Sequence, residues 1–260
     1  MSGSIYMAAS GAMAYGTRLE ILSNNIANVN TVGFKQDKTQ FQQYFSSALD
    51  NSNIQTSGTT DTSQATEFWF ELSTHTDHST GPLKQTGNRF DMAITGNGFF
   101  CVETPDGIQY TRRGDFGMDP NGNLVTQEGW PVLGDGGEIT VESQADFSDI
   151  GGHEILVHDD GTVEVDGNSV GKLRIVEFAD PQLLTKVGHT NFMASAGAAA
   201  ESPATDYIIS QGVVELSNVD AVRMMTELIE TLRGYESYQK VIRSIDEVNS
   251  RAINEVGKTS

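Results

Sequence analysis

Residues 4–30 read SIYMAASGAMAYGTRLEILSNNIANVN, and their apolar side chains recur at steps of three and four. The stripe consists of Ile5, Ala8, Ala12, Tyr15, Leu19, Leu22, Ile26 and Val29. This spacing predicts one α-helix of roughly 26 residues, about 40 Å long. Gly11 and Gly16 each weaken such a helix by about 1 kcal/mol relative to Ala. We therefore expect it to become ordered only when its stripe is buried.

A second helical stripe closes the chain. It consists of Val222, Met225, Ile229 and Leu232, and it resumes with Ile242, Ile245, Asn249 and Ala252. A Ser-x-x-Asp sequence at Ser217–Asp220 resembles a capping box, so we expect a helix from there to about Val256. Gly234 interrupts the regular spacing near the middle, which predicts a disturbed seam or a bend at that point.

The segment between the helices changes character twice. Residues 46–67 are mostly Ser, Thr, Asn, Gln and Asp, which indicates an extended or flexible connector, with Phe68-Trp69-Phe70 as its one apolar anchor. From about residue 81 the period becomes two, and turn sequences such as Pro105-Asp106-Gly107 separate short strands. Met92–Ile94 and Phe99–Val102 are expected to pair as a hairpin, and Thr162–Val165, Lys172–Phe178 and Leu124–Thr126 to form further strands.

These patterns predict an α+β fold. Long N- and C-terminal helices pack together as a coiled-coil-like layer, and a mainly antiparallel β domain is inserted between them. The expected boundaries are 1–34 and 217–260 for the helical domain, 35–80 for a polar connector, 81–190 for the β domain and 191–216 for a return segment. The asparagines Asn24, Asn25, Asn28 and Asn30, followed by Gly33, mark the end of the first helix.

Composition excludes several classes of protein. The chain has 16 basic and 35 acidic residues, a net charge of −19, so nucleic-acid or anionic-membrane binding is not expected. No run of about 18 apolar residues occurs, and no Sec-type signal peptide is recognisable. Cys101 is the single cysteine, which excludes an intramolecular disulfide; its apolar surroundings indicate a buried structural residue.

Catalytic and metal-binding signatures are absent from the sequence. There is no Gly-x-Ser-x-Gly elbow, phosphate loop or His-Glu-x-x-His motif. Asp119–Asn123 resembles the start of a calcium loop, but Leu124 replaces the required Gly and Glu128 falls too early. Two histidine groups, His75-Asp77-His78 and His153-His158-Asp159, lie where a rigid set of ligands is not expected. A glycosidase needs two carboxylates that face each other across a cleft. The acidic residues of the β domain, such as Asp115 and Asp135, lie mostly in turns, where Asp serves the backbone. We therefore expect no catalytic, cofactor-binding or metal site.

Three groups of residues resemble bacterial flagellar rod and hook proteins. Ile21-Leu-Ser-Asn-Asn-Ile-Ala-Asn-Val-Asn-Thr-Val-Gly-Phe34 is similar to the N-terminal signature of that family. At the other end, Gln211-Gly212, Val214-Glu215, Ser217–Asp220, Arg233, Tyr235-Glu236 and Lys240–Ile242 also match. The middle agrees at Gly96–Phe100, Tyr110–Arg112, Gly114–Phe116 and Asn123–Thr126. The resemblance covers nearly the whole chain.

The resemblance implies a structural subunit without catalytic activity or a small-molecule substrate. Such subunits pass unfolded through the flagellar type III export apparatus, without a cleaved signal peptide. They assemble in the periplasm with themselves and with other rod proteins, proximal and distal. Their paired terminal helices form the wall of the export channel in a drive shaft that carries torque. Neither nucleic-acid binding nor membrane insertion is implied.

Two forms of rod protein have about this length. Gly81–Asn88, Gly171–Pro181 and the ending Ala252–Val256 look more like the proximal form, and the connector lacks an insertion associated with the distal form. The proximal form is therefore favoured, and the distal form remains the alternative. Two other classes stay open: a periplasmic glycan-acting enzyme and a secreted adhesin with coiled-coil stalks.

Two sets of residues are predicted to matter for assembly. The first should pack helices within and between subunits: Ile5, Leu19, Leu22, Ile26, Val222, Ile229, Leu232, Ile242 and Ile245. The second carries the family motifs at the inner ends of the helices: Asn25, Asn28, Gly33, Phe34, Ser217, Asn218 and Asp220.

Overall fold

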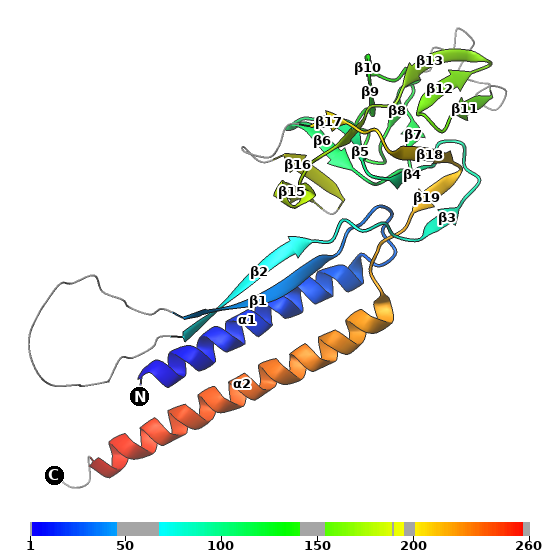
Figure 1. The fold of residues 1–260 in the computed structure, drawn as a ribbon. Helices are drawn as coiled ribbons and strands as arrows, with labels where there is room; N and C mark the ends of the chain where they lie inside the picture. The colour runs from blue at the N-terminus through cyan, green and yellow to red at the C-terminus, as the bar shows by residue number, and fades with distance from the viewer. Residues whose placement is uncertain (1, 46–67, 141–153, 189, 195–200, 257–260) are drawn as a thin grey trace, which may run out of the picture. The chain divides into compact units, whose positions relative to one another are not determined.

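The computed structural model describes residues 2–45, 68–140, 154–188, 190–194 and 201–256 (Figure 1). It has one helix at each end of the chain, α1 (Ser2–Ala27) and α2 (Ala221–Val256). The two helices pack together, and the region between them is mainly antiparallel β-sheet, which confirms this part of the predicted fold. Neither described helix is long and apolar enough to cross a membrane.

The chain divides into two compact units. One unit contains residues 1–24, 37–75 and 222–260, and therefore most of both helices. The other contains residues 25–36 and 76–221. The predicted domain boundaries at residues 34, 80, 190 and 216 remain predictions.

The strands are short and numerous. In chain order they are β1 (Asp37–Phe45), β2 (Phe68–Thr76), β3 (Leu83–Gln85), β4 (Met92–Gly96), β5 (Phe99–Thr104), β6 (Gly107–Thr111), β7 (Gly117–Met118), β8 (Leu124–Val125), β9 (Leu133–Gly134), β10 (Gly137–Glu138), β11 (Ile155–Val157), β12 (Thr162–Val165), β13 (Asn168–Lys172), β14 (Ile175–Glu177), β15 (Leu184–Val187), β16 (Asn191–Ala194), β17 (Ser202–Pro203), β18 (Tyr207–Gln211) and β19 (Val213–Glu215). A short 3₁₀ helix, η2 (Pro181–Leu183), precedes β15, and the Asp180 side chain caps it by accepting from the Gln182 amide.

The largest sheet has six strands in the order β15-β16-β6-β5-β14-β17. Smaller sheets pair β18 with β4, β19 with β3, β7 with β8 and β10 with β9, and β11-β12-β13 forms a meander. The predicted turns at Pro105–Gly107, Pro120–Asn123, Asp160-Gly161 and Asp166-Gly167 are present, each between two antiparallel strands.

Strand β5 explains why the run Phe99–Val102 is apolar at every position. Its side chains alternate between two separate cores. Phe100 and Val102 belong to the larger core, whereas Phe99 and Cys101 belong to a second cluster with Phe192. Because both faces of β5 are covered, the sequence carries no polar alternation there.

Two strand predictions were wrong. We expected Met92–Ile94 and Phe99–Val102 to pair, but β4 pairs with β18 and β5 pairs with β6 and β14. Gly96 and Gly98 both have positive φ, and the Asn97 amide binds the Asp206 carbonyl, so this turn leads the chain from one sheet to another.

The expected strand Lys172–Phe178 is divided into β13 and β14. The break follows from the hydrogen bonds of its two middle residues. The Leu173 amide donates to Gly161 and the Arg174 amide to Leu133, so the chain changes partner between the two strands.

The helix ends also differ from expectation. Residues 217–220 have no regular secondary structure, and α2 begins only at Ala221. The Ser217 hydroxyl accepts from the Val219 amide, which makes a local turn before the helix and not its N-cap. Helix α2 then continues through Gly234 to Val256 without interruption (Figure 1), contrary to the predicted bend.

Residues 46–67, the expected flexible connector, lie outside the described residues. The chain on either side of them forms β1 and β2, which pair in a two-stranded sheet. The sequence pattern did not predict these strands, because the polar composition of the segment dominated its interpretation.

The two helices are antiparallel. Reciprocal contacts between glycines and tyrosines fix the register of one helix against the other. The ring of Tyr238 lies against Gly11, and the ring of Tyr15 lies against Gly234. The centroids of the two rings are 5.4 Å apart. Arg18 and Glu227 add an ion pair with an N–O distance of 3.8 Å. The glycines that weaken the helices individually thus let the helices approach each other.

A methyl group at either glycine should therefore disrupt the seam. A Cβ at residue 11 would lie 2.5 Å from the Tyr238 ring, and one at residue 234 would overlap the Tyr15 ring. We expect Gly11→Ala and Gly234→Ala to destabilise the helix pair by about 1–3 kcal/mol in urea unfolding followed by far-UV circular dichroism, despite the higher helix propensity of Ala.

Gly16→Ala is the matched control, because its Cβ would lie 3.9 Å from the Tyr235 ring, an ordinary contact. This variant should be more stable than wild type by up to about 1 kcal/mol. Equal effects of all three substitutions would contradict the proposed packing of the seam.

Candidate functional site

The predicted helix-packing residues fall into two groups in the structure. Leu22 is buried, and Ile5, Leu19, Ile26, Ile242 and Ile245 are half-buried. The other three residues, Val222, Ile229 and Leu232, are exposed, with 77% of Val222 accessible.

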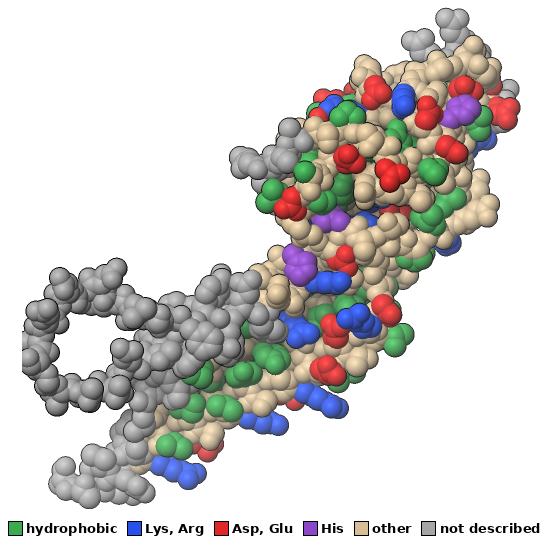
Figure 2. All heavy atoms as spheres, viewed as in Figure 1, with side chains coloured by type: hydrophobic (Ala, Val, Ile, Leu, Met, Phe, Trp, Pro, Cys, Tyr) green, Lys and Arg blue, Asp and Glu red, His purple; other side chains and the backbone are tan. Residues whose placement is uncertain are grey.

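Helix α2 therefore carries two apolar stripes, where the sequence suggested one interrupted stripe. The inner stripe is buried or half-buried and follows alternating steps of four and three: Met224, Leu228, Thr231, Tyr235, Tyr238, Ile242, Ile245 and Asn249. The outer stripe is exposed and consists of Val222, Met225, Ile229 and Leu232. At 100° per residue, the outer stripe lies on a different face of the helix. Figure 2 shows hydrophobic side chains on the surface of the helical part of the chain.

The second candidate site is a buried junction in the other unit. It joins four segments that are distant in sequence: residues 33–36 after α1, residues 77–81, Arg112, and residues 215–218 before α2. Of the predicted motif residues, Gly33, Phe34, Ser217 and Asn218 all lie in it. Asn25 and Asn28 are buried at the end of α1, where Thr31 donates to the Asn28 side chain, and Asp220 is exposed.

An ionic triad lies at the centre of the junction. The Lys35 ammonium donates to Glu215 Oε1 over 2.6 Å, and both side chains are 1% exposed. The Gly81 amide donates to the same oxygen over 2.7 Å, and Arg112 lies 3.6 Å from Glu215 Oε2. Burial lowers the pKa of Lys35, and the Glu215 carboxylate opposes this shift. Each charge is thus out of water and depends on its partners for compensation.

Asn218 connects its own segment to two other junction segments through one side chain. Its Oδ1 accepts from the Gln36 amide over 2.8 Å, and its Nδ2 donates to the carbonyls of Asp77 and Ser79. Gln36 in turn donates to the Asp77 carboxylate over 3.2 Å. This geometry explains why an amide side chain, which both donates and accepts, occupies this position in the motif.

Gly33 and Phe34 close the junction from the α1 side. Gly33 has φ of +68°, and a Cβ there would overlap the backbone of Arg113. Its amide donates to the Glu215 carbonyl over 2.8 Å. Phe34 is buried beneath the Lys186 ammonium, which lies 4.1 Å from the ring centroid.

His78 is half-buried and lies beside the triad. Its ring contacts Phe99 and Phe192, with centroid distances of 5.7 and 5.1 Å. Neither ring nitrogen of His78 has a hydrogen bond to the described residues. The Pro181 backbone lies near enough to the ring to favour the charged form of His78. Burial, with the charges of Lys35 and Arg112, lowers the pKa of His78 to about 4.

The sequence analysis missed the residues Lys35, Arg112 and Glu215 as a site. Two of the three follow buried apolar residues directly, as in Phe34-Lys35 and Val214-Glu215. A charged residue at the end of a buried apolar run can indicate a buried charge. The sequence near Lys35 does not indicate that its partner lies 180 residues away.

The other candidate residues have local roles. Cys101 is fully buried, and burial raises the pKa of its thiol to about 12. The Asp119 carboxylate accepts from Asn121 and Asn123, so it serves the turn between β7 and β8.

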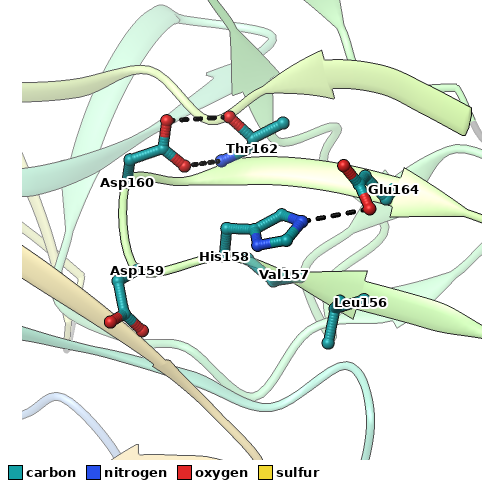
Figure 3. A pocket seen from close by; sticks show the side chains of 7 residues that line it. All are labelled: Leu156, Val157, His158, Asp159, Asp160, Thr162 and Glu164. Atoms are coloured by element: carbon teal, nitrogen blue, oxygen red, sulfur yellow. Dashed lines mark hydrogen bonds and ion pairs between the residues drawn. The ribbon is translucent and has the colours of Figure 1, made fainter. Parts of the chain in front are cut away.

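Residues 141–153, which include His153, lie outside the described residues. Figure 3 shows an open hollow on the β11–β12 hairpin, where His158 pairs with Glu164 and Asp160 with Thr162. The described residues include no group of three or more metal-ligating side chains.

Removing the negative charge of the triad should unfold the junction. Glu215→Gln leaves Lys35 and Arg112 buried without a carboxylate, so we expect a loss of about 3–5 kcal/mol in the free energy of unfolding by urea. Glu164→Gln, in the exposed pair with His158, serves as the control and should change the stability by less than about 1 kcal/mol. Equal effects of the two substitutions would contradict the importance of the triad.

The low pKa of His78 predicts acid sensitivity. Between pH 6.5 and 4 the unfolded chain binds a proton at His78 that the folded chain does not, so stability falls as the pH falls through this window. The contribution amounts to up to about 3 kcal/mol. Urea unfolding of wild type should therefore depend more steeply on pH than that of His78→Leu. His158→Asn, at an exposed position, is the control; equal slopes for wild type and His78→Leu would contradict the prediction.

Comparisons with known proteins give a consistent result. Residues 5–35 match the family of flagella basal body rod proteins, residues 93–165 the D1 domain of flagellar hook protein FlgE/F/G, and residues 210–255 the C-terminal family of flagellar basal body rod FlgEFG proteins. The three ranges include most of the motif residues and the triad members Lys35, Arg112 and Glu215.

Full-length relatives agree with the family matches. The chain is 35% identical to the basal-body rod protein FlgG of Bacillus subtilis, over 98% of this chain and 99% of the relative. It is 34% identical to FlgF of Caulobacter vibrioides, over 99% of both chains, and 31% identical to FlgF of Mesorhizobium japonicum over the full length of both. These relatives are structural proteins of the flagellum and not enzymes. The chain therefore belongs to the flagellar basal-body rod protein family.

Proposed function

We propose that this chain is a structural subunit of the flagellar rod that assembles through its terminal helices. The observation that carries the proposal is the second apolar stripe of α2. The inner stripe packs against α1, whereas the side chains of Val222, Met225, Ile229 and Leu232 are exposed. An exposed apolar stripe of this kind is typical of a surface that another subunit covers.

The inner stripe supports a coiled-coil-like layer. Its alternating steps of four and three are those of a heptad seam, although Thr231 and Asn249 interrupt its apolar character. In the assembled rod this layer would form the wall of the export channel, with the β region outside it. The partners in this proposal are other copies of the chain, the other proximal and distal rod proteins, and the flagellar type III export apparatus that delivers the subunit to the periplasm.

Within the rod we propose the proximal position, with the distal position as the alternative. The support comes from the sequence segments Gly81–Asn88 and Gly171–Pro181, which resemble the proximal form. The relatives do not distinguish the two positions, because proteins named FlgF and FlgG match to nearly the same extent.

A label in isolated basal bodies tests this function. The turn Pro105–Gly107 between β5 and β6 is exposed, and Gly107 has open space around it, so a short peptide tag is tolerated there. With the tag bound by gold-labelled antibody, electron microscopy should show label on the proximal part of the rod. Label on the distal part would replace the proximal assignment by the distal one. Basal bodies without label on the rod, from motile cells that produce the tagged chain, would contradict the function itself.

A further inference from the structure

One histidine lies in a short segment between two strands, with its ring against buried aromatic side chains. We call residues 77–81 the strap; it lies between β2 and β3 and has no regular secondary structure. The His78 ring contacts Phe99 and Phe192, at centroid distances of 5.7 and 5.1 Å. Both phenylalanines belong to the second buried cluster of the β region. The neutral ring therefore anchors the strap to this cluster.

Hydrogen bonds from the buried junction hold the rest of the strap. Lys35 Nζ donates to the Ser79 carbonyl over 2.8 Å, and Asn218 Nδ2 donates to the same carbonyl over 3.2 Å. The Gly81 amide donates to Glu215 Oε1 over 2.7 Å. The strap belongs to none of the described strands, so these bonds and the anchoring ring can be released without breaking a strand ladder.

The surroundings of the His78 ring disfavour a proton on it. Burial has the largest effect, and the positive charges of Lys35 and Arg112 act in the same direction. The Pro181 backbone and the Asp77 carboxylate favour the charged ring, but they do not outweigh burial and the two cations. The pKa of His78 is therefore lowered to about 4, so the ring is neutral near pH 7 while the strap is closed.

The two cations are fixed in place, whereas the histidine lies on the strap. Lys35 is 1% exposed and is bound to Glu215, and Arg112 donates to two carbonyls of β4. Moving either cation would leave the Glu215 carboxylate without one of its compensating charges. A protonated ring is therefore relieved of the repulsion when it moves out into water, and the strap moves with it.

We propose that His78 makes the strap acid-sensitive: a proton on its ring releases the ring from Phe99 and Phe192 and opens the strap, while β5 and β6 stay paired. Opening breaks the bonds of the strap to Lys35 and Glu215, so the junction is closed near neutral pH and loosened in acid. This local opening differs from unfolding of the whole chain. It involves contacts within one chain only, so it does not depend on the proposed function.

Amide hydrogen exchange of the full chain, followed by NMR from pH 7 to pH 4.5, tests the proposal. The Ser79 and Gly81 amides donate to carboxylates in the closed strap, so their protection factors report its opening. With a pKa of about 4 in the closed strap and 6.5 in the open one, opening should become about 50-fold more favourable over this range. At each pH the strap amides should be less protected than those of β5 and β6. Equal protection of the strap and these strands would show that only the whole chain unfolds, and would overturn the proposal.

A matched variant separates His78 from the carboxylates that also titrate in acid. His78→Phe keeps an aromatic ring in the same place but cannot bind a proton, so its strap should stay protected and lose most of the 50-fold change. His158→Asn, at an exposed position paired with Glu164, is the control and should keep the wild-type change. If the larger ring prevents folding, His78→Leu provides the same comparison. A strap whose exchange depends on pH in the variant as it does in wild type would contradict the role of His78.

Discussion

The ion pair between Lys35 and Glu215 joins the segment that follows α1 to the segment that precedes α2. The residues are 180 positions apart, and their charged atoms lie 2.6 Å from each other in a site without solvent access. A buried pair of this kind contributes little net stability compared with an apolar core, but it strongly disfavours arrangements that separate the partners. We infer that its role in this fold is to specify that the segment after α1 pairs with the segment before α2 and not with another part of the chain.

Hydrogen bonds of the backbone around the pair connect the same two segments. Gly33 donates to the Glu215 carbonyl, and Asn218 accepts from the amide of Gln36. The end of one helix and the approach to the other are thus joined by hydrogen bonds directly, before the helices themselves begin to pack.

The sequence predicted the classes of element better than their partners. The period of the N-terminal stripe located α1 to within two residues at its start and three at its end, since helical periodicity is a local property. The pairing of β4 with β18 could not be predicted, because strands 115 residues apart leave no mutual signal in one sequence, whereas the turn at Gly96–Gly98 suggested a local hairpin. The spacing around Gly234 also misled: it predicted a disturbed seam or a bend in α2, but the glycine makes room for Tyr15.

The same limit applied to the candidate sites. The motif residues Gly33, Phe34 and Asn218 were identified by resemblance, and only the structure shows what each contacts. The two stripes of α2 overlap in sequence, so they were interpreted as a single stripe with a defect at its middle. Burial separates them, because it distinguishes the positions that α1 covers from those it leaves exposed.

The two units also differ in how completely they bury their own apolar residues. The β region has two closed clusters, and strand β5 belongs to both, so its stability comes from contacts within one chain. The helix pair buries small residues such as Ala8 and Ala14 beside the glycine–tyrosine contacts, and it leaves Tyr6, Met13 and Val222 exposed. Apolar area removed from water supplies about 25 cal/mol per Å², so covering these residues by another subunit would stabilise the helices further. In the proposed function this uneven distribution separates two steps, because the β region would fold within one chain and the helices would gain further stability in the assembly.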